Sequence, residues 1–419
     1  MKEKINKILR IAKENKKVIE NYFFMTILQV LNSFFYLLVY PYLIRVLGVE
    51  SYGIFVFANS IAAYFLFFVN FGLELPSVKT VSVNVDNNIA LSNILSHIFT
   101  AKLFLFVISS IVFLILLFSV PIFINNKLLF TILFVTNISA ILFPQWFFQG
   151  IQKMRVVTYI QILSKFITLP FVFFFVKSKE DLLIYVAIMS LGNVLAGIIA
   201  FFIVLSKGLK ITIKPLSESF IYLKEALPFF YTYLAGTIKE YSIPLFIGFF
   251  LTMRDVAIYD LALKVVIIPR MLIMSINAAI FPKLVRNVNA SIIKKIIKVE
   301  YIVSSILIIL LILFGNLLIN ILGGNGFEMC FPLVLFLSTT IMSWLVVTAY
   351  INFVFIPTNN NYYVTLNQIV SLFTCLIFCL LIFVYKNVLI FGIAISFSAI
   401  SEILFCRFIV RKNSMLKSI

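Results

Sequence analysis

Residues 329–385 read MCFPLVLFLSTTIMSWLVVTAYINFVFIPTNNNYYVTLNQIVSLFTCLIFCLLIFVY and contain no charged side chain. A helix needs about 20 mostly apolar residues to cross a bilayer, so this stretch is too long for one span. The polar segment 357–361 (PTNNN) interrupts it. Because Pro and Asn favour turns, we expect the chain to reverse there. The stretch therefore predicts two consecutive membrane-spanning helices.

The rest of the chain has the same apolar character. Of its 419 residues, 63% are hydrophobic and only 12% are charged, and the mean hydropathy is +1.12. Soluble domains carry roughly 25% charged residues, so no water-soluble fold can cover this much apolar side chain. We therefore expect an all-α polytopic membrane protein. Its twelve predicted transmembrane helices are 21–44, 52–73, 98–120, 128–150, 156–176, 182–205, 227–250, 256–281, 301–322, 330–355, 362–384 and 388–408.

The basic residues predict how these helices are oriented. The chain carries 34 Lys and Arg against 16 Asp and Glu, a net charge of +18. Most of the basic residues between the predicted spans fall in alternate loops, which identifies the cytoplasmic side of a membrane protein. Both termini fall on that side. The charge is thus explained by membrane topology, and no nucleic-acid partner is expected.

The longest well-charged cytoplasmic loop is 206–226. It divides the chain into an amino-terminal lobe, 1–205, and a carboxy-terminal lobe, 227–419, each with six predicted spans. Because six is even, both lobes enter the membrane with the same orientation. Residues 49–58 and 253–262 align as a weak internal repeat. Parallel repeats related by an axis along the membrane normal are typical of transporters, so we predict two six-helix lobes with pseudo-two-fold symmetry.

Five cationic side chains interrupt the predicted spans: Lys102, Lys165, Lys239, Lys264 and Arg270. Each costs about 2.5–3.5 kcal/mol at the middle of a span if it faces lipid. An inward orientation, toward a hydrated cavity between helices, costs less. Lys102 lies near a predicted span end and could instead extend its ammonium group to the cytoplasmic interface. A positive cavity predicts an anionic cargo.

Acidic residues near these cations leave a second interpretation open. Asp260 and Lys264 are four residues apart and share one helix face. Glu240 directly follows Lys239, and Glu402 is expected nearer the cytoplasmic end of its span. Internal pairing would neutralise these cations, whereas unpaired acids could take up and release ions during a transport cycle. With two well-buried acids expected against five cations, we predict that some positive charge remains for an anion.

Motifs for other chemistry are absent from the sequence. It contains no GxxxxGK[ST] phosphate loop and no HExxH motif. No Cys or His cluster has the spacing of metal ligands. We therefore expect no metal, no cofactor and no enzymatic activity.

Several segments, taken in order, resemble one family of membrane proteins. They are 41–58 (PYLIRVLGVESYGIFVFA), 70–79 (NFGLELPSVK), 145–154 (QWFFQGIQKM), 257–264 (AIYDLALK) and 278–283 (AAIFPK). Together they resemble the Wzx-type polysaccharide flippases, and the resemblance covers most of the chain.

The resemblance implies a fold and a substrate. The fold is that of the multidrug, oligosaccharidyl-lipid and polysaccharide exporter superfamily, in which two six-helix lobes form a V-shaped central cavity. The implied substrate is an undecaprenyl-pyrophosphate-linked oligosaccharide, an O-antigen or capsule repeat unit made on the cytoplasmic face. The implied location is the bacterial cytoplasmic (inner) membrane, among membrane lipids, with a polysaccharide polymerase and a chain-length regulator as further partners.

The resemblance also implies which residues meet the substrate. Such families place cationic side chains in the cavity, and here Lys239, Lys264, Arg270 and Lys165 are the corresponding candidates. Arg45 matches the arginine of the family's PYxxRxLG segment, where it could serve gating and release or cap a helix. Two other functions remain open. A cation-coupled multidrug exporter of the same superfamily would favour acids in the cavity, and a membrane-embedded glycan polymerase or ligase would favour a large outer loop.

Overall fold

The computed structural model describes residues 16–284, 290–324, 326–358, 360 and 362–415. Within these ranges the chain is helical and contains no strand. The elements are α2 (Lys16–Asn70), α3 (Glu74–Val83), α4 (Asn88–Ser119), α5 (Pro121–Asn125), α6 (Lys127–Thr136), α7 (Ser139–Leu142), α8 (Gln145–Gly150), α9 (Met154–Phe175), η1 (Lys179–Asp181), α10 (Leu182–Ser206), α11 (Leu216–Phe250), α12 (Met253–Leu284), α13 (Ala290–Leu322), α14 (Cys330–Tyr350), η3 (Ile351–Phe355), α15 (Tyr362–Cys379), η4 (Leu380–Phe383) and α16 (Leu389–Lys412).

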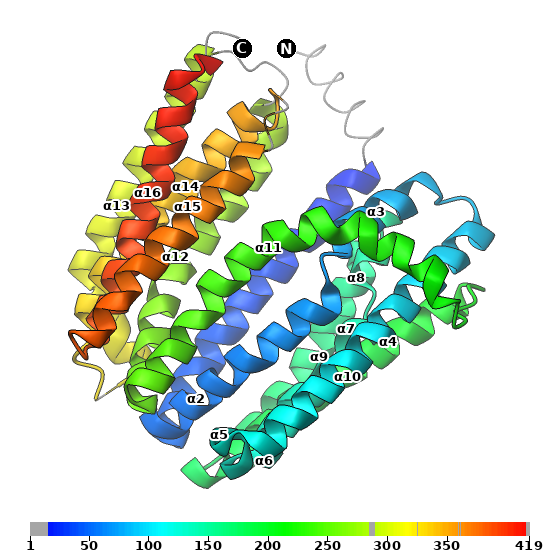
Figure 1. The fold of residues 1–419 in the computed structure, drawn as a ribbon, viewed down its shortest axis with the longest axis horizontal. Helices are drawn as coiled ribbons and strands as arrows, with labels where there is room; N and C mark the ends of the chain where they lie inside the picture. The colour runs from blue at the N-terminus through cyan, green and yellow to red at the C-terminus, as the bar shows by residue number, and fades with distance from the viewer. Residues whose placement is uncertain (1–15, 285–289, 325, 359, 361, 416–419) are drawn as a thin grey trace. The chain divides into compact units, whose positions relative to one another are not determined.

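These helices pack as two compact units (Figure 1). Unit 1 comprises Met1–Tyr36 and Ile61–Tyr233, and unit 2 comprises Leu37–Ser60 and Leu234–Ile419. Helices α2 and α11 contribute residues to both units. The lobes expected at 1–205 and 227–419 stay a prediction, and the units differ from them because the middle of α2 packs with unit 2.

The first two predicted spans form one continuous element, α2, bent at Gly48. Gly48 has φ 75° and ψ 164°, a backbone conformation that only glycine adopts readily. Five residues later, a Cβ on Gly53 would lie 1.8 Å from the carbonyl oxygen of Met253. The absence of a side chain therefore lets this part of α2 lie against the start of α12 inside unit 2.

Unit 1 is built around α4, α9 and α10. Helix α10 packs against α9, α6 and α7, and α8 packs against α3. The span predicted at 128–150 is broken into α6, α7 and α8, and Pro144, which lacks a backbone N–H, lies at the second break. Phe147 and Phe148 of α8 are fully buried, as is Met154 at the start of α9.

Unit 2 has a core of four long helices. Helix α16 packs against α14 and α15, and α13 packs against α14, as Figure 1 shows in red, orange and yellow. Buried side chains from three of these elements meet near Val346, Val354, Phe355 and Cys406. The uncharged stretch 329–385 is divided between residues 355 and 362, where the sequence predicted a reversal.

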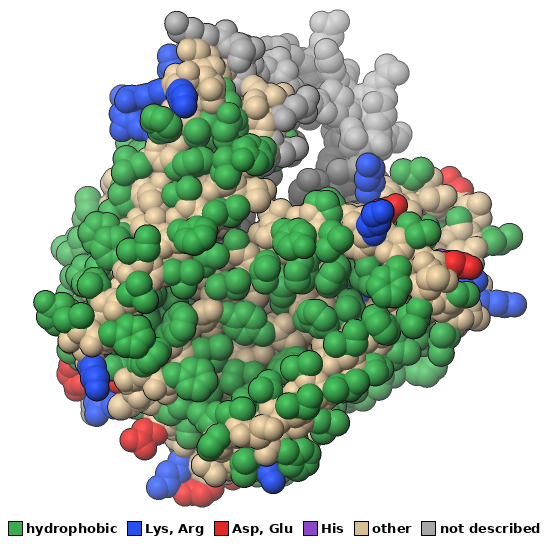
Figure 2. All heavy atoms as spheres, in the orientation of Figure 1, with side chains coloured by type: hydrophobic (Ala, Val, Ile, Leu, Met, Phe, Trp, Pro, Cys, Tyr) green, Lys and Arg blue, Asp and Glu red, His purple; other side chains and the backbone are tan. Residues whose placement is uncertain are grey.

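The surface is that of a protein solvated by lipid. Large apolar side chains are exposed along the helices, with Phe166 78% accessible and Phe174 72% accessible. Hydrophobic side chains dominate the visible face, and the charged ones lie near helix ends (Figure 2). Among the described residues, nine helical segments are long and apolar enough to cross a bilayer, and the first, Phe23–Val83, contains two predicted spans. The predicted fold class, an all-α polytopic membrane protein, is confirmed.

Candidate functional site

The cations that the sequence placed inside the spans divide between the two units. Lys102 and Lys165 belong to unit 1, whereas Lys239, Lys264 and Arg270 belong to unit 2. The two groups of cations therefore have separate sets of neighbours.

Lys102 is buried in unit 1. Only 3% of the residue is exposed. Its ammonium group donates to Asn70 Oδ1 at 2.8 Å and to the carbonyl oxygen of Ala140 at 3.0 Å. Ala140 lies in the short helix α7, whose carbonyls lack a continuing helix to pair with. The alternative that Lys102 extends to the cytoplasmic interface does not hold, because its buried ammonium group donates to Asn70 and to the broken fourth span.

Lys165 of α9 also has neutral partners. Its ammonium group donates to Asn32 Oδ1 of α2 and lies 4.8 Å from the centroid of the Phe35 ring. In the described part of the chain, neither Lys165 nor Lys102 has a carboxylate oxygen within 4.0 Å. Neutral oxygens and an aromatic face orient an ammonium group without cancelling its charge. Glu74 acts on Lys102 electrostatically from farther away, so the two lysines exceed this acid by one positive charge.

Both lysines line one cavity of about 330 Å³ within unit 1. The amide side chains of Gln145, Gln161 and Asn193 line the same cavity. In a chain that is 63% hydrophobic, polar side chains are thus concentrated around one internal space. Polar and ionisable groups inside a membrane protein usually mark a substrate or ion pathway.

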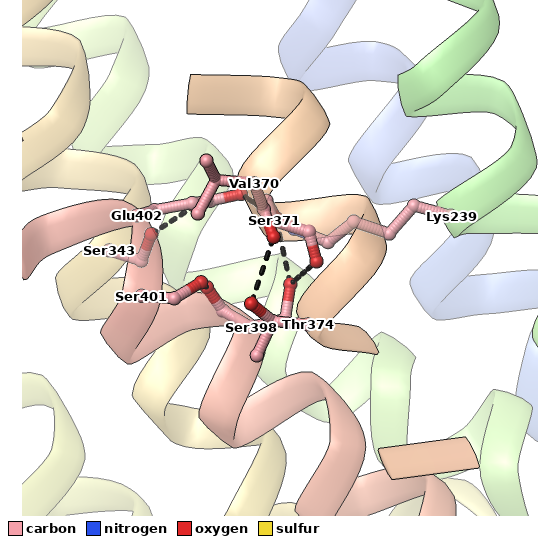
Figure 3. A network of polar contacts seen from close by, with 8 residues as sticks. All are labelled: Lys239, Ser343, Val370, Ser371, Thr374, Ser398, Ser401 and Glu402. Carbon is pink, nitrogen blue, oxygen red and sulfur yellow. Dashed lines mark hydrogen bonds and ion pairs between the residues drawn. The ribbon is translucent and has the colours of Figure 1, made fainter. Parts of the chain in front are cut away.

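In unit 2, Lys239 of α11 forms a buried ion pair with Glu402 of α16 (Figure 3). The Lys239 Nζ lies 2.7 Å from Glu402 Oε1 and 2.7 Å from Ser371 Oγ. Ser371 donates to the same Glu402 oxygen at 2.5 Å, and Ser343 donates to Oε2. Ser398 continues the network with a 2.7 Å bond between its Oγ and that of Ser371. Glu402 is therefore held as an ionised acceptor by groups from three neighbouring helices.

Sequence analysis did not identify Glu402 as the partner of Lys239. Glu402 is only 7% exposed, although it was expected near the cytoplasmic end of its span. Glu240, expected among the well-buried acids, is exposed instead. The available signal was that Glu402 is the single acid in the predicted span 388–408.

Asp260 is the second buried acid near a cation. Its Oδ1 lies 3.9 Å from the ammonium group of Lys264, one helical turn along α12. Its Oδ2 accepts hydrogen bonds from Tyr52 at 2.8 Å and from Tyr40 at 3.2 Å. The two tyrosines lie on either side of the bend at Gly48, so Asp260 connects both arms of α2 to α12.

Arg270 and Arg45 have different environments. The guanidinium of Arg270 lies 5.1 Å from the centroid of the Trp344 ring, and its buried Nε has no hydrogen-bond partner among the residues that the structure describes. Arg45 is exposed and donates to the carbonyl oxygen of Ile321 at 2.8 Å. Ile321 lies at the end of α13, where helix carbonyls lack partners and a cation is favourable. Arg45 thus has the geometry of a helix cap.

Comparison with known proteins identifies relatives that match about three quarters of the chain. A protein of Escherichia coli strain K12 named "Putative O-antigen transporter" is 27% identical over 316 residues, which cover 74% of this chain and 76% of that protein. A protein of the same name from Shigella dysenteriae is 24% identical over 331 residues, covering 75% and 83%.

Solved structures share the fold at low sequence identity. A crystal structure of MATE in complex with MaD5 matches with a TM-score of 0.59 and 15% identity over 97% of each chain. The inward-facing conformation of a multidrug resistance MATE family transporter of the MOP superfamily matches with a TM-score of 0.57 and 14% identity, over 94% of this chain and 99% of the other. Residues 18–288 match the polysaccharide biosynthesis protein family. The chain therefore belongs to the polysaccharide biosynthesis protein family, as its resemblance to the Wzx-type polysaccharide flippases predicted.

Proposed function

We propose that this protein is a flippase for an undecaprenyl-pyrophosphate-linked oligosaccharide. It moves the O-antigen or capsule repeat unit from the cytoplasmic to the outer leaflet of the bacterial inner membrane by alternating access. Family membership and the relatives named as O-antigen transporters support a transporter of this kind. The fold is shared with transporters solved in inward-facing and outward-facing conformations, which supports alternating access.

The observation that carries the proposal is the excess of positive charge around one cavity, which is lined by Lys102 and Lys165 but by a single carboxylate, Glu74. In the described residues, both ammonium groups donate hydrogen bonds to neutral oxygens only. A lysine inside a span costs about 2.5–3.5 kcal/mol on insertion scales. An anionic headgroup that enters such a cavity finds the ammonium groups already oriented. Lysine binds phosphate oxygens as a point charge, so a pyrophosphate is a suitable ligand.

Lys239 and Lys264 have a different part in this proposal. Each is paired with a carboxylate in the structure, at 2.7 Å and 3.9 Å. A pyrophosphate that binds either cation has to compete with Glu402 or Asp260. These two pairs therefore respond to the substrate by opening, whereas Arg270 has no such competitor within 4.0 Å among the described residues.

The buried acids favour one alternative, a cation-coupled multidrug exporter. Glu402 and Asp260 are 7% and 8% exposed, and a carboxylate at this depth can exchange a cation or a proton during a cycle. Such an exporter would lose activity when these acids are neutralised and would tolerate replacement of Lys165. A flippase would instead lose activity when Lys165 is replaced.

The test is deletion of the gene in its host, followed by complementation. We expect lipid-linked repeat units to accumulate in the inner leaflet, with loss of surface polysaccharide that the wild-type gene restores and Lys165→Ala does not. Lys179→Ala is the matched control, because the Lys179 side chain is 74% exposed at a helix end. Normal surface polysaccharide in the deletion strain refutes the flippase. If the deletion strain becomes sensitive to drugs and the Lys165→Ala gene fully restores its resistance, the exporter is supported.

A further inference from the structure

Three amide side chains line the cavity of unit 1. Gln145 comes from α8, Gln161 from α9 and Asn193 from α10, and all three line the cavity. Among the described residues, none of the three amides has a hydrogen-bond partner. Three separate helices therefore direct unpaired donors and acceptors toward one space.

One face of α9 carries polar side chains that line the same cavity. Gln161, Ser164, Lys165 and Thr168 recur at intervals of three and four residues, which places them on one side of a helix. All four line the cavity. The opposite side of α9 is apolar and exposed, with Phe166 78% accessible. The polar stripe is thus local to the cavity and is not a general property of the helix.

The chemistry of the unpaired groups indicates which ligand they suit. A primary amide offers two donors on nitrogen and an acceptor oxygen. A phosphate is an acceptor only and would leave three amide oxygens unmatched. A sugar hydroxyl donates and accepts at once, so it satisfies both halves of an amide. The spare ammonium donors of Lys102 and Lys165 add further contacts to hydroxyl or ring oxygens, since each of the three donors of an ammonium group can bond.

The size of the cavity agrees with a sugar. Its volume of about 330 Å³ lies at the lower end of the range of about 300–1,000 Å³ for small-molecule sites. We propose that this cavity binds an uncharged sugar of the repeat unit beside the pyrophosphate held by Lys102 and Lys165, with Gln145, Gln161 and Asn193 binding the hydroxyl groups of the sugar. The proposal rests on the flippase function and adds a specificity-determining sugar site within unit 1.

The probe for this site is the free oligosaccharide released by mild acid from the lipid-linked material of the deletion strain. Saturation-transfer NMR on the purified full-length protein measures its binding, and the binding of inorganic pyrophosphate is measured separately. We expect Gln161→Leu and Asn193→Leu each to weaken oligosaccharide binding about tenfold, since each removes the amide's hydrogen bonds. Gln149→Leu, a glutamine outside the cavity lining, should bind as wild type does.

The outcomes separate this proposal from the proposed function. Wild-type affinity in both Gln161→Leu and Asn193→Leu overturns the sugar site, while loss of surface polysaccharide in Lys165→Ala still supports the flippase. Pyrophosphate binding that weakens in Gln161→Leu and Asn193→Leu as much as oligosaccharide binding does assigns these amides to the anion and also overturns the sugar site. The combined emission of Trp146, which is 5% exposed in unit 1, and of Trp344 in unit 2 shows whether each variant has kept its fold. If the deletion strain yields no lipid-linked material, the flippase fails first, and the sugar site fails with it.

Discussion

Neutralising Glu402 should destabilise unit 2, because it leaves the ammonium group of Lys239 inside the helix bundle without its counter-charge. The Glu402→Gln substitution keeps the shape of the side chain and an acceptor oxygen, but it removes the negative charge. The two side chains are 10% and 23% exposed, so water cannot fully replace the lost partner.

The size of the effect follows from the burial of the pair. Removing one member of a buried ion pair costs about 3–5 kcal/mol in soluble proteins. Polar interactions measured inside a membrane protein average about 0.6 kcal/mol and reach about 1.7 kcal/mol, because the unfolded chain in the membrane also finds partners. With Lys239 partly exposed, we expect a loss of about 1.5–3 kcal/mol. For a unit of this size, that lowers the melting temperature by about 3–12 °C.

The chain carries a suitable reporter for this measurement. Its four cysteines are free and buried, and all of them belong to unit 2. A dye that becomes fluorescent on reaction with thiols therefore reports the thermal unfolding of unit 2 in detergent. The double variant Lys239→Met/Glu402→Gln should recover at least half of the lost stability, since removing both charges leaves no unpaired one.

The exposed pair of Arg254 and Glu328 provides a matched control in the same unit, at 3.9 Å and with side chains 52% and 79% exposed. The cycle Arg254→Met/Glu328→Gln should show little coupling, because exposed ion pairs contribute little to stability. Strictly additive effects of Lys239→Met and Glu402→Gln would refute the buried pair. Transport by the stabilised double variant then separates two roles for Lys239: loss of transport supports contact with substrate, and retention supports packing alone.

Three further substitutions test individual contacts. Gly53→Ala should lower the stability of unit 2 by about 3 kcal/mol or more, because the added methyl group meets the backbone of Met253 and not a flexible side chain. The thiol dye measures this loss, and a wild-type melting temperature would contradict the close approach. Tyr52→Phe removes a hydrogen bond to the Asp260 carboxylate and should cost about 1.5–3 kcal/mol in the same assay. Lys102→Met should abolish rescue of surface polysaccharide in the deletion strain while the protein still elutes as a folded monodisperse species, and full rescue would exclude Lys102 from the transport path.

The fold could be predicted from the sequence because bilayer thickness constrains helix length. Each predicted span corresponds to a helix or a broken helix, and the reversal near 357–361 was visible in its Pro and Asn residues. The interruption at Gly48 was predicted, since it lies between the spans 21–44 and 52–73, but its form was not: the chain bends within one element, α2, at this glycine. The break at Pro144 was also missed, although proline was the available signal.

The partners of the charges could be predicted only where they are local. Asp260 and Lys264 share a helix face by spacing alone, and they do lie 3.9 Å apart. The partner of Lys239 is 163 residues away in the chain, and Asn70 lies 32 residues before Lys102. Helical periodicity gives the face that a side chain occupies but not the helix that covers that face. The distinction between a neutral and an acidic partner therefore requires the packed structure.

The difference between neutral and acidic partners gives the cations of the two units different roles. In unit 1, Lys102 and Lys165 are oriented by amide and carbonyl oxygens, which stabilise an ammonium group and leave its charge uncancelled. In unit 2, Lys239 and Lys264 each lie beside a carboxylate, so each pair is close to neutral before any ligand arrives. An anion gains more from the first arrangement, because it breaks no direct ion pair among the described residues. A change in the second arrangement instead releases a carboxylate, and a released carboxylate can bind a proton or a cation. These contacts thus favour anion binding in unit 1 and a response to ions in unit 2. Separate replacement of Lys165 and Glu402 distinguishes the two roles. Replacing Lys165 should remove substrate binding, whereas replacing Glu402 should change the dependence of transport on ions.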